Sequence, residues 1–466
     1  MNLKKIIVFS IGPLGSAFLG FLTLPLLSWS YDKNVVGQYS LFQSIISFLL
    51  MAFVLGFDMI YMREYNDTNK KKLLLNELTF FCILTSLCAF LVSILVIKYN
   101  NFNVEIFGDW LHIILIIVSV IGLIVIRFWS VWFRMEGDAL TFSLSQIIQK
   151  ISFLIIIVVL FLLDWSKSSV ELILIYTVSI VTTCLYLLSK LKVLSCYSSF
   201  KVSKAIKTSL LLLPRSIPIM IGSIAYWGML YFDKLFIGYY LGFEELAVYS
   251  MATSFSSIGL VIQIIFTTIW APSVYKSVSE GGANDLLTPT VNKLIIGSLV
   301  YIGIVGVFSP LATYILPSTY YSIREILMIT MIVPVINVFS EATAIGLHVV
   351  RKTKYLMLSS LVACALNCLG NYLLIPFIGL KGAAVSTLLS LLIFAFIRTE
   401  ISYRIWFRFS RLRIYFYLLA LCLVAVFSTY FESFGIPLFW NIAVWMLFLI
   451  SGILLVIFFN RDIVNR

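Results

Sequence analysis

Apolar runs of about 20 residues recur along the whole chain, and they limit its possible folds more than any other feature. A helix of that length crosses the hydrocarbon core of a bilayer, which is about 30 Å thick. With 61% hydrophobic and only 12% charged residues, a soluble fold of this size could not cover its surface. We therefore predict an all-α polytopic membrane protein.

Turn and charge signals between the runs predict about fourteen transmembrane helices. The basic start "MNLKKIIVFS" leads into a run that continues to Trp29 without a cleavage pattern, which indicates a retained first span. The predicted limits are 6–29, 39–62, 78–98, 110–133, 142–163, 171–189, 208–231, 246–270, 289–316, 324–350, 355–375, 382–397, 414–431 and 439–459.

Lys and Arg concentrate in alternate connecting segments, including Lys70 to Lys72, Lys190 to Lys207 and Arg398 to Arg413. The positive-inside rule places these segments and both termini in the cytoplasm. The net charge of +12 is then a topology signal together with contact to anionic membrane lipid. A nucleic-acid partner is not expected, because such a partner would need a soluble basic domain.

The connecting segments are short, the longest being residues 190–207. A membrane polymerase or glycosyltransferase would need a larger loop for its catalytic residues, and no phosphate-binding loop for ATP is present. The seven cysteines lie in predicted spans or, for Cys196, in a basic loop. We therefore expect no enzymatic activity, no catalytic residues, no cofactor, no metal site and no disulfide.

The two halves of the chain contain similar segments. "VGQYSLFQSI" (36–45) aligns with "LAVYSMATSF" (246–255), and "RMEGDALTFSLSQII" (134–148) aligns with "VRKTKYLMLSSLVAC" (350–364). The similar offsets of 210 and 216 residues indicate a parallel repeat of six spans. We predict an N-lobe with its connecting loop over 1–207, a C-lobe over 208–397 and two extra helices over 398–466, with a substrate site between the lobes.

Three segments carry a family resemblance: "PLLSWSYDKNVVGQYSLF" (25–42), "YFDKLFIGYYLGFEELAVYSMA" (231–252) and "NYLLIPFIGLKGAAVST" (371–387). They resemble polysaccharide exporters of the MATE-like flippase superfamily, in particular O-antigen-type flippases. The resemblance covers essentially the whole chain. The aspartate–arginine pair usual after the seventh span is here Asp233–Lys234, which keeps both charges but loses the planar guanidinium.

The resemblance implies a substrate, a location and partners. The substrate would be an undecaprenyl-diphosphate-linked oligosaccharide, moved by alternating access across a bacterial inner membrane for lipopolysaccharide or a similar surface polysaccharide. A polysaccharide polymerase and chain-length proteins would be its protein partners.

Ionisable residues inside the spans indicate where a substrate could bind. Arg127, Lys150 and Arg215 lie in predicted spans at similar depths. In "LLLPRSIPIM" (211–220), Pro214 and Pro218 should kink the helix beside a cavity that Arg215 faces. Our hypothesis is that Arg215 and Lys150 bind the diphosphate, because charged donors suit its oxygens. The remaining substrate-binding candidates are Arg127, Gln146 and Asn367.

Glu341 is the only acid that the predicted spans place deep in the membrane, and it shares a helical face with Asn337. We expect Glu341 and Asn337 to serve in coupling or gating, together with Asp233, Pro214 and Pro218. Structural alternatives remain open at this point. Arg127 extends to the inner interface, Lys150 or Arg215 pairs with Glu341, and the asparagines join helices.

Two other function classes compete with a lipid-linked oligosaccharide flippase. A cation-coupled multidrug exporter of the same fold would need deep acids for cationic drugs, whereas this chain has mainly deep cations. A membrane polysaccharide polymerase would need a large outer loop, which the predicted topology does not contain.

Overall fold

Helices make up nearly all of the chain in the computed structural model. The structure describes residues 3–99, 110–163, 167–190, 200–279, 284–350, 352, 354–406, 408–431, 434 and 437–464. Cys196 and half of the predicted 190–207 loop lie outside these residues. The end of that predicted loop is helical, since α8 begins at Val202.

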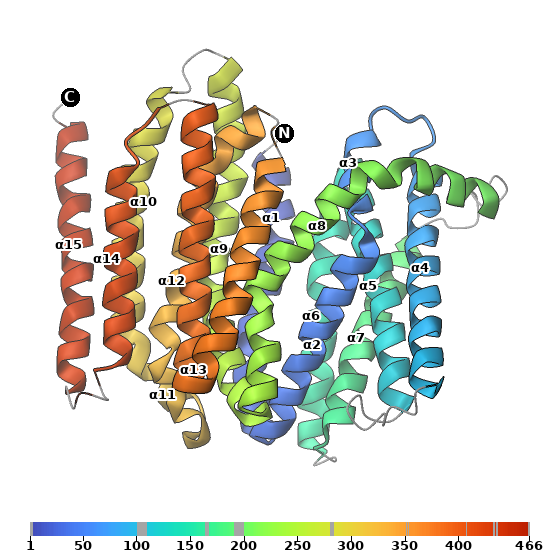
Figure 1. The fold of residues 1–466 in the computed structure, drawn as a ribbon, viewed down its shortest axis with the longest axis horizontal. Coiled ribbons are helices and arrows are strands. Elements are labelled where there is room, and N and C mark those ends of the chain that lie inside the picture. Colours follow the sequence, from blue (N-terminus) through green and yellow to red (C-terminus); the bar gives the residue numbers. More distant parts are fainter. Residues whose placement is uncertain are drawn as a thin grey trace. The chain divides into compact units, whose positions relative to one another are not determined.

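The α-helices, most of them long, are joined by short connections, as Figure 1 shows for each part of the chain. In chain order they are α1 (Leu3–Ser30), α2 (Lys33–Val54), α3 (Phe57–Glu64), α4 (Lys71–Tyr99), α5 (Trp110–Glu136), α6 (Ala139–Leu162), α7 (Ser169–Lys190), α8 (Val202–Tyr240), α9 (Phe243–Ser279), α10 (Asn284–Phe308), α11 (Ala312–Ile315), α12 (Leu327–Val349), α13 (Lys354–Ile405), α14 (Leu412–Thr429) and α15 (Leu438–Val464). Short 3-10 helices cover Ser309–Leu311 and Ser318–Glu325.

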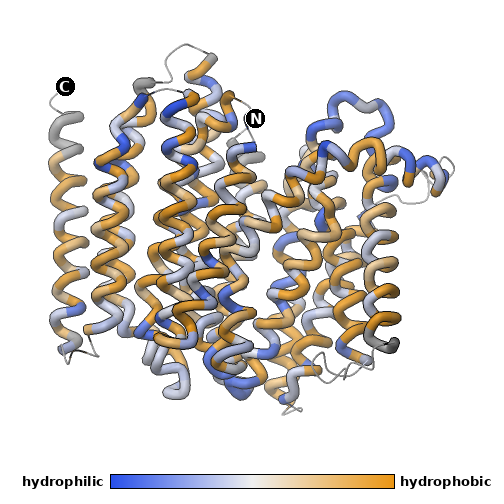
Figure 2. Tube along the Cα trace, in the orientation of Figure 1, coloured by the Kyte–Doolittle hydropathy of each residue, from blue (hydrophilic) through white to orange (hydrophobic). Residues whose placement is uncertain are grey.

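Among the described residues, 13 helices are long and apolar enough to cross a membrane. Figure 2 shows apolar residues along most of their length and polar residues gathered at their ends. The 52-residue α13 accounts for two of the fourteen predicted spans, because Ile378 and Gly379 leave helical geometry inside it. The predicted all-helical polytopic fold is confirmed.

The first compact unit (unit 1) comprises Met1–Thr23 and Ser30–Trp227. Within it α5 and α7 pack against each other; α2 and α4 pack on α5, and α6 packs on both α5 and α7. Unit 1 also includes the first part of α8 and therefore contains both Lys150 and Arg215. The second compact unit (unit 2) comprises Leu24–Trp29 and Gly228–Arg466.

Unit 2 is organised around α12, which packs against α9, α10, α13 and α14. The spanning window of α12 is 89% buried, so this helix forms the core of the unit. The two halves of α13 form a hairpin in which the α carbon of Gly382 closely approaches the Leu374 carbonyl group. A Cβ at Gly382 would lie 2.5 Å from that carbonyl oxygen, so only glycine allows the approach. α15 packs along α10.

A sharp break between α2 and α3 positions the charged residues of unit 1. Leu55 and Gly56 both have positive φ values, 55° and 71°. Positive φ is costly for leucine and free for glycine, so the break persists only because its surroundings hold it. A Cβ on Gly56 would lie 2.9 Å from the carbonyl oxygen of Ser216 in α8. The break therefore packs directly against the part of α8 that contains Pro214 and Pro218.

We expect Gly56→Ala to lower the thermal stability of the detergent-purified protein by about 2 kcal/mol or more, from a strained φ plus a backbone clash. Gly242→Ala is the matched control, because Gly242 has a φ of 88° but nothing within 4 Å of its Cβ position. That control should cost only about 1 kcal/mol. Equal melting temperatures for the two variants would contradict the close packing of Gly56 on α8.

Candidate functional site

The α2–α3 break places the Asp58 carboxylate next to Arg127, one of the three cations predicted for the site. Asp58 lies in the first turn of α3 and its side chain is 8% exposed. The guanidinium of Arg127, on α5, donates from Nη2 and Nε to Asp58 Oδ2 at 2.7 and 2.9 Å. A carboxylate also suits the positive end of a helix. Arg127 is thus neutralised within its own unit and does not extend alone to the interface.

Arg215 has a much weaker partner. Its Nη1 donates to Glu64 Oε1 at 3.3 Å, and the side chains of Arg215 and Glu64 are 70% and 32% exposed. Exposed pairs of this kind contribute little to stability, so a better anion can displace Glu64. Pro214 and Pro218 lie inside α8, whose ribbon is bent in Figure 1. Within unit 1, the acidic partner of Arg215 is Glu64, and the alternative pairing of Arg215 with Glu341 stays untested.

Lys150, on α6, is the predicted site cation that the structure leaves without an acidic partner among the described residues. α6 packs closely on α1 one to two turns before it. A Cβ on Gly12 would touch Ser143, and one on Gly15 would touch Ile147. The hydroxyl of Ser143 donates to the Val8 carbonyl oxygen. Lys150 and Gln146 are both half-buried, and the alternative pairing of Lys150 with Glu341 stays untested.

A cluster of aromatic and amide side chains lies on the same helical face as Lys150. Phe153, three residues further along α6, stacks on Tyr39 of α2 with ring centroids 5.5 Å apart. The amide of Gln43 donates to the Tyr39 hydroxyl at 2.6 Å. Tyr176 of α7 meets Tyr39 edge-on at 5.9 Å. Rings and amides beside a cation suit a sugar linked to a phosphate.

Unit 2 contains a buried carboxylate with neutral partners. Asp233 is 1% exposed and lies inside α8, not in an outer loop as the predicted span limit implied. The hydroxyls of Tyr249 and Thr387 donate to its Oδ2, the latter at 3.3 Å. The Lys234 backbone N–H donates to Oδ1 at 2.7 Å. Among the described residues no Lys or Arg side chain forms an ion pair with Asp233.

A row of amides continues from this carboxylate along α13. The Asn367 amide donates to the hydroxyls of Thr387 and Ser390 at 3.1 and 3.4 Å. Asn371 donates to Asn367 Oδ1 at 3.0 Å, and Asn371 Oδ1 is buried without a partner. Asn367 therefore joins the two halves of α13, and its role as a substrate ligand stays a prediction. The open Asn371 oxygen is a ready acceptor for a proton donor or a small cation.

Glu341, on α12, is held by a residue that the sequence placed in a cytoplasmic segment. Arg398 of α13 donates from Nη1 to Glu341 Oε1 at 2.8 Å and to Ser340 Oγ at 3.1 Å. The Arg398 side chain is 6% exposed. Asn337, one turn away on α12, is also buried. Glu341 is not the only deep acid, because Asp58 and Asp233 are buried as well.

Two tyrosines at helix ends have raised pKa values. Burial, then the hydrogen bond to Glu136, raises the pKa of Tyr65 to about 12. Its hydroxyl donates to Glu136 Oε1 at 2.7 Å. Burial, then the charge of Glu171, raises the pKa of Tyr31 to about 12. Both phenols therefore stay protonated donors at neutral pH.

Sequence reasoning missed Asp58, Arg398, Tyr249 and Thr387 as members of these clusters. Arg398 was assigned to a basic cytoplasmic segment, where charges are ordinary, and Asp58 was not singled out. A signal existed for Asp58, since it follows a glycine that can interrupt a span. Among the described residues, no three His, Cys, Asp or Glu side chains converge as a metal site would require.

The fold is similar to that of several solved membrane transporters. The lipid II flippase MurJ, in an inward closed conformation, matches with a TM-score of 0.69 at 13% identity, covering 98% of this chain and 100% of that chain. An inward-facing MATE multidrug resistance transporter matches with a TM-score of 0.58 at 14% identity, covering 90% and 96%. A MOP transporter from Pyrococcus furiosus, described by the reverse polarity of its binding pocket, matches with a TM-score of 0.59 at 14% identity, covering 90% and 96%.

The family follows from the sequence itself. The pattern of the polysaccharide biosynthesis protein family matches residues 2–278, more than half of the chain. The chain belongs to this family and is a multi-pass membrane protein. No curated protein sequence matches it.

Proposed function

We propose that the chain is a flippase that moves an undecaprenyl-diphosphate-linked oligosaccharide, such as an O-antigen unit, from the cytoplasmic to the outer leaflet of a bacterial inner membrane. Its role would be transport without covalent chemistry. A polysaccharide polymerase and chain-length proteins would act on the delivered unit. The family supports a role in polysaccharide synthesis, and the fold supports transport.

The observation that carries this proposal is the unpaired charge of Lys150. Of the three cations predicted for the site, Arg127 is neutralised by Asp58 and Arg215 has a weak, exposed partner. Lys150 lacks an acidic partner among the described side chains and lies beside rings and amides. A half-buried cation on a membrane-spanning helix favours an anionic partner, and a diphosphate supplies one.

Arg215 would be the second diphosphate ligand, released from Glu64 when substrate arrives. The Arg215 guanidinium can bind two phosphate oxygens at once. The Glu64 carboxylate, 3.3 Å from Arg215 Nη1, is too weakly held to block that binding. Gln146 would bind sugar or phosphate oxygens, and Arg127 would raise the local potential without direct contact. Pro214 and Pro218 would let α8 bend between conformations.

Coupling to an ion gradient is assigned to Asp233. A carboxylate with hydroxyl and amide neighbours gains a proton or a monovalent cation without breaking an ion pair. Glu341 is the weaker candidate, because Arg398 already neutralises it. Glu341 and Asn337 would serve gating through the α12–α13 contact.

The competing function is cation-coupled multidrug export. An exporter of cationic drugs needs an accessible acid without a cationic partner. In the described residues, Asp58 and Glu341 are paired with arginines, and Asp233 and Glu77 are only 1% and 3% exposed. Purified protein in vesicles distinguishes the two functions. We expect translocation of fluorescent lipid-linked oligosaccharide and no uptake of ethidium, whereas ethidium transport without lipid translocation would favour the exporter.

A matched pair of variants tests Arg215. Arg215→Ala should lower translocation at least about tenfold through loss of a charged hydrogen bond, and Arg215→Lys should retain part of the activity. Glu64→Gln removes the same ion pair from the other side and should leave translocation unchanged. If both variants lose activity equally, Arg215 serves the Glu64 pair and does not bind substrate.

The Glu341–Arg398 pair allows a test of gating against structure. Glu341→Gln leaves the Arg398 guanidinium, whose side chain is 6% exposed, without its anion; it should lower stability by about 3 kcal/mol and slow translocation. Arg398→Gln should cost less, because the acid that it leaves unpaired, Glu341, is 33% exposed. Thermal melting and translocation are measured on the same preparations. A Glu341→Gln variant with parental rate would leave this residue a purely structural role.

A further inference from the structure

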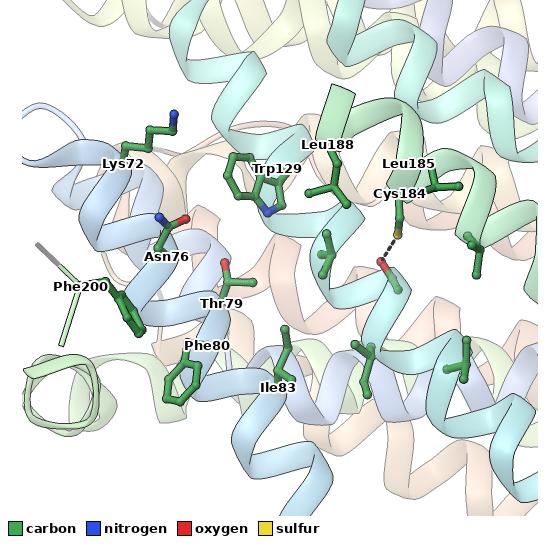
Figure 3. Close-up of a pocket in the computed structure, with 15 residues that line it drawn as sticks. Lys72, Asn76, Thr79, Phe80, Ile83, Trp129, Cys184, Leu185, Leu188 and Phe200 are labelled. Carbon is green, nitrogen blue, oxygen red and sulfur yellow. Dashed lines mark hydrogen bonds between the residues drawn. The ribbon is translucent and has the colours of Figure 1, made fainter. Parts of the chain in front are cut away.

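A groove of about 600 Å³ lies between α4, α5 and α7 of unit 1, outside the proposed substrate site. Figure 3 shows its lining. Successive turns of α4 supply Lys72, Asn76, Phe80 and Ile83, and α7 supplies Val181 on the opposite wall. Phe200 contacts Phe80 edge-on, with ring centroids 5.4 Å apart, and closes one side.

The floor of the groove is built by a close approach of α5 and α7. A Cβ on Gly122 would lie 2.5 Å from the Ile180 Cγ2 atom, so glycine allows the two helices to touch. The Cys184 thiol donates to the Gly122 carbonyl oxygen at 3.3 Å, the dashed line in Figure 3. α4 also packs on α5, and the groove occupies the space between α4 and α7.

Polarity changes along the groove in one direction. Lys72 and Asn76 form a polar end, and Thr79 is followed by Phe80 and Ile83. At 1.5 Å per helical residue, Lys72 and Ile83 are separated by about 16 Å. One leaflet of hydrocarbon is about 15 Å thick. The groove therefore has the length of one leaflet, with its charge where a lipid headgroup lies.

The polar end carries excess positive charge. Lys70 and Lys71 precede Lys72, and Lys201 follows Phe200. Lys71 is turned away, because its ammonium lies 4.1 Å from the centre of the Tyr65 ring. Lys72 is the cation that lines the groove. Basic pockets between transmembrane helices favour acidic lipid headgroups.

We propose that this groove binds one acidic phospholipid of the membrane, with its phosphate at Lys72 and an acyl chain along α4. The site goes beyond the transport function and does not depend on the identity of the transported substrate. An undecaprenyl chain is several times longer than the groove, which favours a phospholipid as the occupant.

The test is native mass spectrometry of the detergent-purified full chain titrated with dioleoyl phosphatidylglycerol or dioleoyl phosphatidylcholine. We expect one phosphatidylglycerol to bind more tightly than phosphatidylcholine. Lys72→Gln should weaken phosphatidylglycerol alone, by about fivefold, the effect of one lysine at an anionic lipid surface. Val181→Trp should fill the groove and weaken both lipids by about tenfold.

Two control variants separate the groove from the general surface. Val178 is on the same helix and is 40% exposed, like Val181 at 38%, but does not line the groove. Lys70 is exposed and precedes α4. Val178→Trp and Lys70→Gln should bind lipid as the parent does. Equal binding of both lipids by the parent, or equal losses in the control variants, would overturn the proposal.

Competition identifies the source of the anion. Undecaprenyl phosphate or inorganic phosphate at equal concentration should not displace phosphatidylglycerol. Displacement by undecaprenyl phosphate would assign the groove to the carrier lipid, and displacement by inorganic phosphate would reduce it to an anion site. Either result overturns the phospholipid assignment. Melting temperatures of all variants confirm that they remain folded.

Discussion

Lys150→Gln is expected to abolish translocation of lipid-linked oligosaccharide while the protein still inserts and accumulates. Lys150 is the deep cation of unit 1 with no acidic partner among the described residues, so removing its charge breaks no ion pair there. Loss of a charged contact to a diphosphate, worth about 3 kcal/mol, corresponds to a rate lower by about 100-fold. The measurement is translocation in vesicles, with surface polymer as the cellular readout.

Two further variants define the role of Lys150. Lys150→Arg keeps the charge and should retain part of the rate, whereas Lys204→Gln removes an exposed lysine of α8 in the same unit and should have no effect. Parental export by a normally expressed Lys150→Gln variant would remove the observation on which the proposed function rests. If Lys150→Gln is inactive but melts at a higher temperature than the parent, substrate binding by Lys150 is supported, because an unpaired charge removed from water lowers stability.

Asp233→Asn is expected to uncouple transport from its ion gradient. Asparagine keeps the shape and still accepts from the Tyr249 and Thr387 hydroxyls, so unit 2 should stay folded. The variant should bind substrate within about threefold of the parent, a difference below 1 kcal/mol. Its translocation rate should no longer respond to an imposed sodium or proton gradient.

Replacing sodium by choline at constant pH, and changing pH at constant sodium, identifies which cation the parent uses. Tyr249→Phe removes one donor to Asp233 and should alter the ion dependence. Tyr239→Phe, at an 83% exposed position of α8, the helix that contains Asp233, is the control. If Asp233→Asn follows the gradient as the parent does, coupling resides elsewhere in the chain.

The fold was readable from the sequence because membrane spans depend on local composition. Twenty apolar residues form a helix in lipid whatever their neighbours are, so even the break inside α13 was predicted, between the spans 355–375 and 382–397. The 1–207 and 208–397 lobe boundaries and the repeat stay predictions. Superposition of spans one to six on spans seven to twelve is their test.

The candidate site was less predictable because ion pairing depends on which helices meet. Depth in a span identified Arg127 and Glu341 but not their partners, Asp58 and Arg398. Those partners lie near helix ends in sequence and looked like ordinary topology charges. Asp233 was missed as a deep residue because aromatic and charged residues before Tyr240 ended the predicted span early. Contacts between distant segments decide these points, and a single sequence does not contain them.

The α10–α15 seam has a consequence for biogenesis. Leu449 and Trp445 of α15 pack against Gly303 and Gly306 of α10, and Trp445 is fully buried there. α15 leaves the ribosome more than a hundred residues after α10, on the order of ten seconds later. During that interval the glycine surface of the nascent chain faces lipid or an insertion factor. The packed surface of α10 is therefore completed only after α15 has been made.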